Sequence, residues 1–239
     1  MANKFYNNLI SHWLMNDDEA NTDVLDNKGS NDGVMNVNTD TKSVAGKINK
    51  ALDFDGTNDY VEIPDSADFD VGGKLTVCAW VYSNGAWSGD AIILHDISEY
   101  KWMIYASGTP ASKVILYIKT ASGLIGTSYN TNDLNDGKWH FVVGVYDKTL
   151  ESQRLKVYID GVLDQTADGY NEDILDGDQG VHIATSYSGL TNGLQAKVDD
   201  VRIYNTAITP YYVKLLYNNG AGTEDENVQS NTLLLGCNF

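Results

Sequence analysis

Short apolar runs with alternating polar residues recur along most of the chain. The clearest are residues 75–82, 139–147 and 155–164, and in the second run Trp139, Phe141, Val143 and Val145 fall on one face of a strand. Asp160-Gly161 is typical of a tight hairpin turn, and residues 52–64 hold two shorter strands around Asp55-Gly56. Weaker strands are predicted at residues 9–15, 91–95, 101–106, 113–120, 123–129 and 180–184. The pattern predicts antiparallel sheet.

One helix is predicted near the end of the chain. Thr209 is a suitable N-cap, Pro210 suits the first turn, and Tyr212, Leu215 and Leu216 share a face. The helix is expected to close at Asn218-Asn219-Gly220. We therefore expect one domain over residues 1–220, followed by a polar tail at 221–239 with an apolar end.

Composition agrees with a single β-rich domain. The chain has 239 residues, with 22 glycines and three prolines, and sandwiches of this length are common as one unit. The net charge of -17 argues against nucleic-acid binding and against anionic membranes. No export signal and no apolar stretch of membrane-spanning length is present, so membrane insertion is not expected. Two cysteines, Cys78 and Cys237, make no disulfide framework.

Two adjacent aspartates open the run from Lys197 to Asn205. A strand period of two places Asp199 on the same face as Val201 and Ile203, and Asp200 on the other face. A buried carboxylate is costly unless it is hydrogen-bonded, paired or bound to a cation. This pattern points to a partner for Asp199 elsewhere in the chain, and calcium is the first candidate.

Several motifs together resemble the laminin-G-like group of concanavalin A-like jelly rolls, of the bacterial or phage type. They span most of residues 9–220, and they are His12 to Met15, Asp26 to Gly33, Ala51 to Val61, Thr76 to Tyr82, Trp139-His140, Leu155 to Gly161, Val198 to Asn205 with Ala207, and Leu216 to Asn218. The resemblance implies an all-β, two-sheet antiparallel jelly-roll sandwich with one short C-terminal helix. It also implies rim loops that contact glycans or proteins, and it does not imply catalysis.

The resemblance places the loop from Asp26 to Gly33 near the strand that holds Asp199. Calcium takes six to eight oxygen ligands, and we therefore expect a structural calcium at Asp26, Asp32 and Asp199. The alternative is that Asp26 and Asp32 are ordinary turn residues and that Asp199 bonds to backbone amides.

Aromatic residues in or beside polar loops are the candidates for ligand contact. Sugar rings stack on aromatic faces, and the candidates are Trp87, Tyr100, Trp102 and Tyr187, whereas Trp80 and Trp139 belong to core patterns. Packing at a sandwich edge is the alternative role for these four residues.

No catalytic constellation is apparent. A sandwich glucanase would need carboxylates flanking the scissile bond, typically from a Glu-x-Asp-x-Glu strand, and that pattern is absent. Four histidines, His12, His95, His140 and His182, occur singly. The sequence thus favours a non-catalytic, carbohydrate-binding recognition module with structural calcium, located outside the cell or on a virion or cell surface. The alternative is a structural or protein-interaction domain of a larger assembly that docks through residues 221–239. A glycoside hydrolase or polysaccharide lyase is the least favoured possibility.

Overall fold

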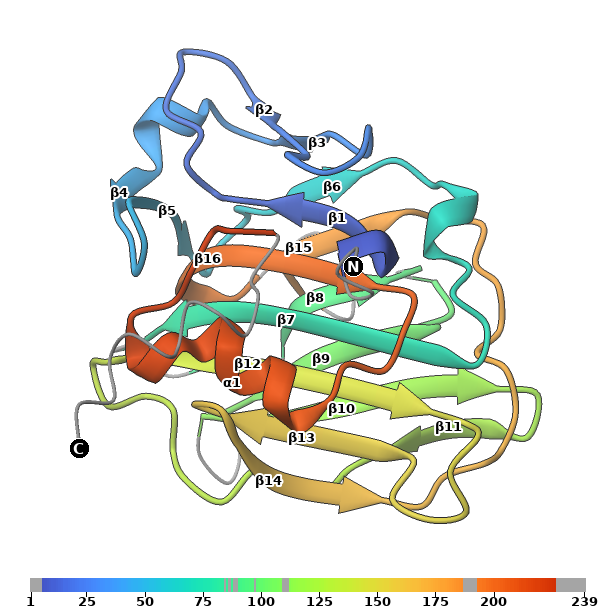
Figure 1. Ribbon diagram of the computed structural model, residues 1–239. Helices are drawn as coiled ribbons and strands as arrows, with labels where there is room; N and C mark the ends of the chain where they lie inside the picture. The colour runs from blue at the N-terminus through green and yellow to red at the C-terminus, as the bar shows by residue number, and fades with distance from the viewer. Residues whose placement is uncertain are drawn as a thin grey trace.

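The protein is a sandwich of two antiparallel sheets, as Figure 1 shows. The computed structural model describes residues 6–83, 85, 87, 90–96, 98–108, 112–186 and 193–226. In spatial order the first sheet contains β14 (Val162–Ala167), β13 (Leu155–Ile159), β12 (Trp139–Asp147), β7 (Lys74–Tyr82), β16 (Gln195–Tyr204), β5 (Lys50–Asp55) and β4 (Ser43–Ala45), with β1 (Leu9–Trp13) also paired to β16. The second contains β11 (Gly123–Gly126), β10 (Lys113–Thr120), β9 (Trp102–Ser107), β8 (Asp90–His95), β15 (Val181–Ser186), β6 (Val61–Ile63), β3 (Gly33–Met35) and β2 (Asp23–Val24).

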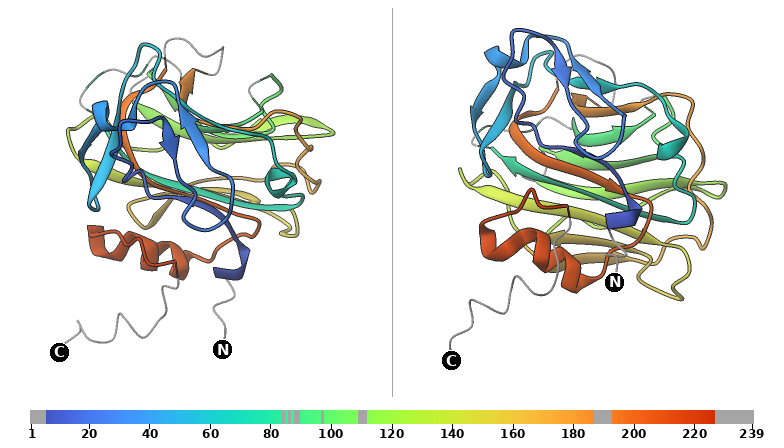
Figure 2. Two further views of the ribbon diagram at one scale, coloured as in Figure 1. Left: turned by 90° about the horizontal axis from the view of Figure 1, so that it is seen from above. Right: turned by 45° about the horizontal axis from the view of Figure 1, so that its top comes forward.

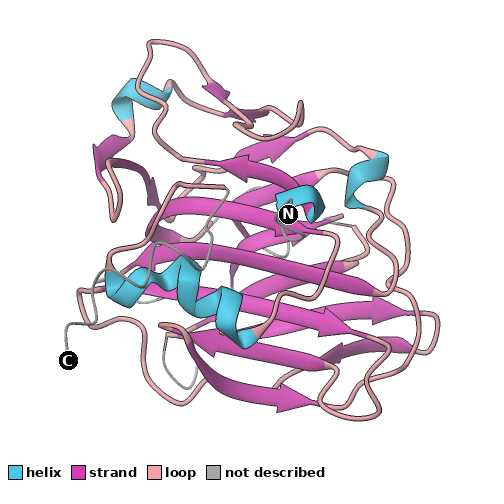
Figure 3. Cartoon of the chain, in the orientation of Figure 1, coloured by secondary structure: helices cyan, strands magenta, loops and turns pink. Residues whose placement is uncertain are grey.

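The main core lies between the two sheets. Alternation along each strand supplies it: Val77, Ala79 and Val81 face inward from β7, as do Ile104 and Ala106 from β9. Burying a valine or isoleucine side chain stabilises a fold by roughly 1.5–3 kcal/mol. The jelly-roll sandwich expected from the sequence is thereby confirmed, and Figure 3 shows how strongly strands dominate.

A second apolar cluster lies outside the first sheet, under α1 (Pro210–Tyr217). Figure 2 shows this helix on the side of the first sheet that faces away from the second. The Thr209 side chain accepts a hydrogen bond from Tyr212 N at 3.2 Å, as its capping role predicts. The Tyr217 ring stacks on Trp80 with centroids 5.6 Å apart. The short single-turn helices are Tyr6–Asn8, Thr39–Thr41, Ala67–Phe69 and Asn218–Gly220.

A β-bulge interrupts β16 at the two aspartates. The pairing register with β7 shifts between Asp199 and Arg202, and Asp200 has a φ of 51°. Consequently Val198 and Val201 both face the core, while Asp199 lies opposite Trp80 on the outer face. The expectation that Asp199 points into the core with Val201 is wrong, because a bulge adds one residue and breaks the period of two.

Residues 223–226 pack across the first sheet, although the sequence assigns them to the tail. We name them the C-terminal strap. Glu224 accepts hydrogen bonds from Asn16 Nδ2 at 2.8 Å and Asn49 Nδ2 at 2.7 Å. Glu226 Oε1 lies 3.2 Å from His12 Nδ1, and the carbonyl of Thr223 accepts from Arg202. The strap therefore joins the end of the described chain to β1 and β16.

Removal of the strap is expected to destabilise the fold. Truncation after Gly222 should lower the free energy of unfolding by about 3 kcal/mol relative to truncation after Glu226, because charge-assisted hydrogen bonds are lost. For a chain of this size the melting temperature should fall by roughly 6–12 °C. Calorimetry on the two truncated chains tests this, and equal melting temperatures would show that the strap contacts contribute nothing.

Candidate functional site

The structure separates the four predicted ligand-contacting aromatic residues. Trp102 is fully buried and Trp87 is 3% exposed, and both belong to the main core. Trp102 opens β9, whose alternation turns it inward with Ile104 and Ala106. The prediction of ligand contact is corrected for these two tryptophans. Tyr187 lies outside the described residues.

Tyr100 is the remaining predicted residue, and it lies on the outer face of the second sheet. It packs there against Met103, together with Tyr105 and Tyr117. We name these four side chains the tyrosine face. Tyr105 comes from β9 and Tyr117 from β10, and the inward neighbours of both belong to the core. The single α-helix within the described ranges covers the other sheet, so it leaves this face open.

The tyrosine face continues as a transverse row across the sheet. Strand register aligns one position on each of seven neighbouring strands, which are β3, β6, β15, β8, β9, β10 and β11 in spatial order. On the six strands other than β8 these positions are Val34, Glu62, His182, Met103, Tyr117 and Gly126. Adjacent strands are about 4.8 Å apart, so the row from β3 to β10 is about 24 Å long. That length suits an extended ligand laid across the strands.

Two rings of the tyrosine face, those of Tyr105 and Tyr117, meet edge to face. The ring centroids of Tyr105 and Tyr117 lie 5.9 Å apart with an interplanar angle of 73°, which is a favoured aromatic geometry. Gly126 lies opposite Tyr117 and leaves room for the ring, since a Cβ at this glycine would fall 2.6 Å from two of its ring carbons. Tyr105 and Tyr117 are half-buried, so each ring keeps surface open to solvent.

Polar groups accompany the rings along the row. His182 is 4% exposed, and within the described part of the chain its Nδ1 has no hydrogen-bond partner. Burial lowers the pKa of His182, so the ring is neutral at neutral pH. The exposed Glu62 lies directly opposite on β6. The face thus combines aromatic surface, tyrosyl hydroxyls and a carboxylate, with a neutral imidazole buried beneath them.

The three residues predicted to hold calcium are not gathered into one site. Both oxygens of Asp26 accept backbone hydrogen bonds, Oδ1 from His12 and Lys28 and Oδ2 from Asn31. Asp32 is exposed and accepts from Asp26 N at 2.8 Å. In this loop the carboxylates organise the turn, as the alternative interpretation expects.

Asp199 is fully buried, and its side chain contacts the loop that contains Ile48 rather than the loop from Asp26 to Gly33. Its Oδ2 accepts from Ile48 N at 2.8 Å, while its Oδ1 has no partner among the described residues. Burial raises the pKa of Asp199 to about 8. Within the described ranges no three His, Cys, Asp or Glu side chains are placed to hold a metal ion. Asp199 alone of the three offers a free buried oxygen, and the predicted set does not fit as a unit.

The calcium site remains a prediction, and thermal unfolding in calcium and in chelator tests it. A cation held by Asp199 should raise the melting temperature by several degrees in calcium relative to chelator, because a ligand of the folded state stabilises it. The Asp199→Asn chain should lose that response, whereas Asp32→Asn should keep it. A thermal transition that is identical in calcium and in chelator would exclude the site.

Sequence reasoning passed over Tyr105 and Tyr117. The available signal was the alternation in residues 113–120, which places Tyr117 on the same face as Lys113 and Lys119 and therefore outward. Alternation could not predict that Tyr105 lies close to Tyr117, because that contact depends on the register between β9 and β10.

The fold and these surfaces define a lectin-type β-sandwich. The family model described as the concanavalin A-like lectin/glucanases superfamily matches residues 55–214. The chain therefore belongs to this superfamily, as its motifs predict. No curated protein sequence matches the chain.

Solved structures with the same fold include several binding domains. The binding domain of Paraclostridial mosquitocidal protein 1 is 12% identical with a TM-score of 0.70, and the match covers 91% of this chain and 53% of the other. Botulinum neurotoxin type C, which depends on interaction with two ganglioside molecules to enter cells, is 14% identical with a TM-score of 0.65 and coverage of 92% and 52%. This chain thus spans about half the length of both.

A third similar structure is a domain of comparable size. Domain 4 of AbnA, an extracellular arabinanase from Geobacillus stearothermophilus, was solved in complex with arabinotriose. It is 17% identical with a TM-score of 0.63, and the match covers 86% of this chain and 96% of that domain. At these identities the likeness concerns the fold.

Proposed function

We propose that this chain is a non-catalytic carbohydrate-binding module and that the tyrosine face is its contact surface. The observation that carries the proposal is the pair of half-buried rings, Tyr105 and Tyr117, set edge to face on the open sheet. Two of the similar structures, by their descriptions, involve gangliosides or arabinotriose. These neighbours support the class of ligand and leave the particular glycan undetermined.

The chemistry of the row suits a sugar chain. Aromatic rings offer apolar surface to the C–H face of a pyranose or furanose, and the tyrosyl hydroxyls both donate and accept hydrogen bonds. The exposed carboxylate of Glu62 lies on the same row and is available for sugar hydroxyls, whereas His182 Nδ1 is buried beneath the surface. A long, shallow contact of this kind is typical of binding to polymers rather than to one small molecule.

The proposed location of the protein follows from the weak binding expected of a single site. One shallow face gives modest affinity, and display of many copies would raise it by avidity. An exposed position outside the cell, such as a cell surface or a virion, is therefore part of the proposal, as is the structural calcium at Asp199. None of the helices in the described ranges has the length and apolarity that a bilayer-spanning helix requires.

Loss of the Tyr117 ring should abolish most glycan binding. On a glycan array, Tyr117→Ala should weaken any signal about tenfold or more, because stacked aromatic contacts contribute about 0.5–1.5 kcal/mol and the adjacent hydroxyl is lost as well. Tyr170→Ala is the matched control, since Tyr170 is 40% exposed and lies outside the tyrosine face. Both chains should first show unchanged circular dichroism.

Two other results would contradict the carbohydrate-binding proposal and favour a different function. Release of reducing ends from a polysaccharide would identify an enzyme. Silence on a broad array, with loss of assembly after deletion of residues 227–239, which spares the C-terminal strap, would favour the alternative of a domain that docks through residues 221–239. The predicted apolar segment of that region, Leu233 to Phe239, lies outside the described residues.

A further inference from the structure

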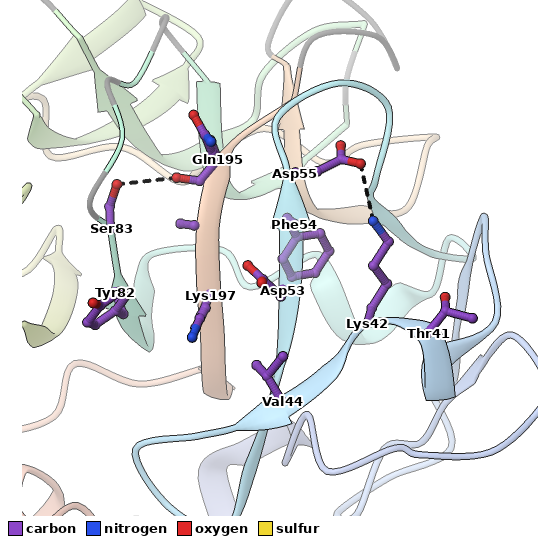
Figure 4. Close-up of a pocket in the computed structure, with 11 residues that line it drawn as sticks. Thr41, Lys42, Val44, Asp53, Phe54, Asp55, Tyr82, Ser83, Gln195 and Lys197 are labelled. Carbon is purple, nitrogen blue, oxygen red and sulfur yellow. Dashed lines mark hydrogen bonds and ion pairs between the residues drawn. The ribbon is translucent and has the colours of Figure 1, made fainter. Parts of the chain in front are cut away.

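A polar pocket of about 500 Å³ lies on the outer face of the first sheet, on the opposite side of the sandwich from the tyrosine face. Figure 4 shows its lining side chains, which come from β4, β5, β7, β16 and the segments next to them. Its volume lies within the range of small-molecule sites. The sequence analysis had not proposed a binding site at this pocket.

The pocket continues as a transverse row that alternates charge and aromatic surface. Asp53 on β5 lies opposite Lys197 on β16, Lys197 lies opposite Tyr82 on β7, and Tyr82 lies opposite Trp139 on β12. Lys197 Nζ is 5.2 Å from the Tyr82 ring centroid, within cation–π range. The Tyr82 and Trp139 centroids are 5.7 Å apart. Both rings are half-buried, and they extend the charged pair into an aromatic platform.

The pocket is fixed on its far side by ion pairs. Lys42 Nζ lies 3.2 Å from Asp55 Oδ2, as drawn in Figure 4, and it also pairs with the buried Asp59. Asp59 in turn accepts from Asp55 N at 3.1 Å, which ties down the turn after β5. Lys42 is therefore already neutralised, and the ion pairs hold this wall in place.

Asp53 and Lys197 are the free polar pair of the pocket. Burial raises the pKa of Asp53, while the nearby Lys197 and Lys42 oppose that rise. Among the described residues Lys197 makes no ion pair within 4.0 Å, and its ammonium lies over the Tyr82 ring. A carboxylate that only accepts and an ammonium that only donates thus face the same space.

We propose that this pocket binds a neutral sugar residue and is a second carbohydrate site on the chain. Neighbouring sugar hydroxyls both donate and accept, so one can donate to Asp53 while the next accepts from Lys197 and the ring face rests on Tyr82. A charged ligand fits less well, because the fixed charges of the pocket nearly cancel. The inference rests on the proposed function, and it adds that one chain binds glycans on both outer faces and can bridge two of them.

Nuclear magnetic resonance titration with neutral trisaccharides tests the second site directly. With arabinotriose, cellotriose and maltotriose as probes, at least one should shift the backbone signals of Tyr82 and Lys197 and the indole signal of Trp139. Lys197→Met keeps the aliphatic stem over the ring and removes the charge, and it should weaken binding here about tenfold or more, since charge-assisted hydrogen bonds are strong. Lys214→Met, an exposed site on α1, is the matched control.

The outcomes distinguish the two proposals. Shifts confined to Tyr105 and Tyr117, or pocket shifts that survive Lys197→Met unchanged, would overturn the second site and leave the tyrosine face standing. Pocket shifts that persist in Tyr117→Ala and vanish in Lys197→Met would support two independent sites. Shifts at neither face, with all three probes and on a broad glycan array, would overturn both.

Discussion

Replacing Asp200 with alanine is expected to lower the free energy of unfolding by about 3–5 kcal/mol, because the buried guanidinium of Arg202 would lose its ionic partner. Asp200, Arg202 and His12 are all fully buried on the outer side of the first sheet. Asp200 Oδ1 lies 2.6 Å from His12 Nε2 and 2.9 Å from Arg202 Nη2. Without Asp200 the guanidinium would stay buried and would lose its ion-pair partner, while the carbonyl of Thr223 would still accept from it. Urea unfolding of the two chains measures the loss.

The same group should make the fold sensitive to acid. Burial opposes ionisation of Asp200, but Arg202 and His12 outweigh it and hold the pKa of the carboxyl below its ordinary value. A lowered pKa gives stability that is present above the unfolded value, about 4, and is lost as the pH falls through the folded value. The difference in stability between the unchanged chain and the Asp200→Ala chain should therefore shrink below about pH 4. Asp40→Ala, at an exposed site, should change stability little at any pH; equal losses at both sites would contradict the buried network.

The neighbouring aspartate should respond in the opposite direction. Burial raises the pKa of Asp199 to about 8, so the folded chain holds this proton where the unfolded chain releases it. The contribution of Asp199 to stability should fall as the pH rises from about 4 to about 8, in total by about 6 kcal/mol at most, and stay constant above that. In chelator, Asp199→Asn should match the unchanged chain near pH 4 and exceed it in stability near pH 8.5.

This comparison also reports on the predicted ion. Calcium held by Asp199 would replace the proton and remove the pH dependence of the unchanged chain, while the Asp199→Asn chain would not respond. Urea unfolding at the two pH values, in chelator and in calcium, gives the four measurements. Parallel pH profiles for the two chains would show that Asp199 ionises normally in the folded state.

Local pattern was sufficient for most of the elements. The run 155–164 alternates around Asp160-Gly161, and the structure has β13 and β14 joined there, with φ of 52° and 78° at the two turn residues. Thr209-Pro210 likewise marks the start of α1. Such features depend on residues close in sequence, so propensity and period decide them. The candidate site was predicted only in part, since Tyr100 lies on the tyrosine face and the two tryptophans do not.

The bulge at Asp199 and Asp200 shows where local pattern fails. A period of two assumes regular pairing, and the extra residue lies at the point where β16 stops pairing with β5 and begins to pair with β1. That arrangement turns both carboxylates toward the outer face, where Ile48, His12 and Arg202 receive them. Ile48 and His12 are far from the two aspartates along the chain, so no local signal identifies them as partners. Arg202 is the exception, because it is two residues from Asp200 and a period of two places both on one face.

The sequence by itself determined the sheet class, the longer strands, the hairpin and the closing helix, because each follows from hydrophobic period and turn chemistry over a few residues. It did not predict the short strands β2, β3 and β4, which are too short to show a period. Only the tertiary structure decided which side chains meet across strands. The register between β9 and β10 brings Tyr105 to Tyr117, and the register of β5, β16 and β7 aligns Asp53, Lys197 and Tyr82. Strand pairing is set by packing of the whole core, and a shift of one residue would turn each of these side chains to the other face.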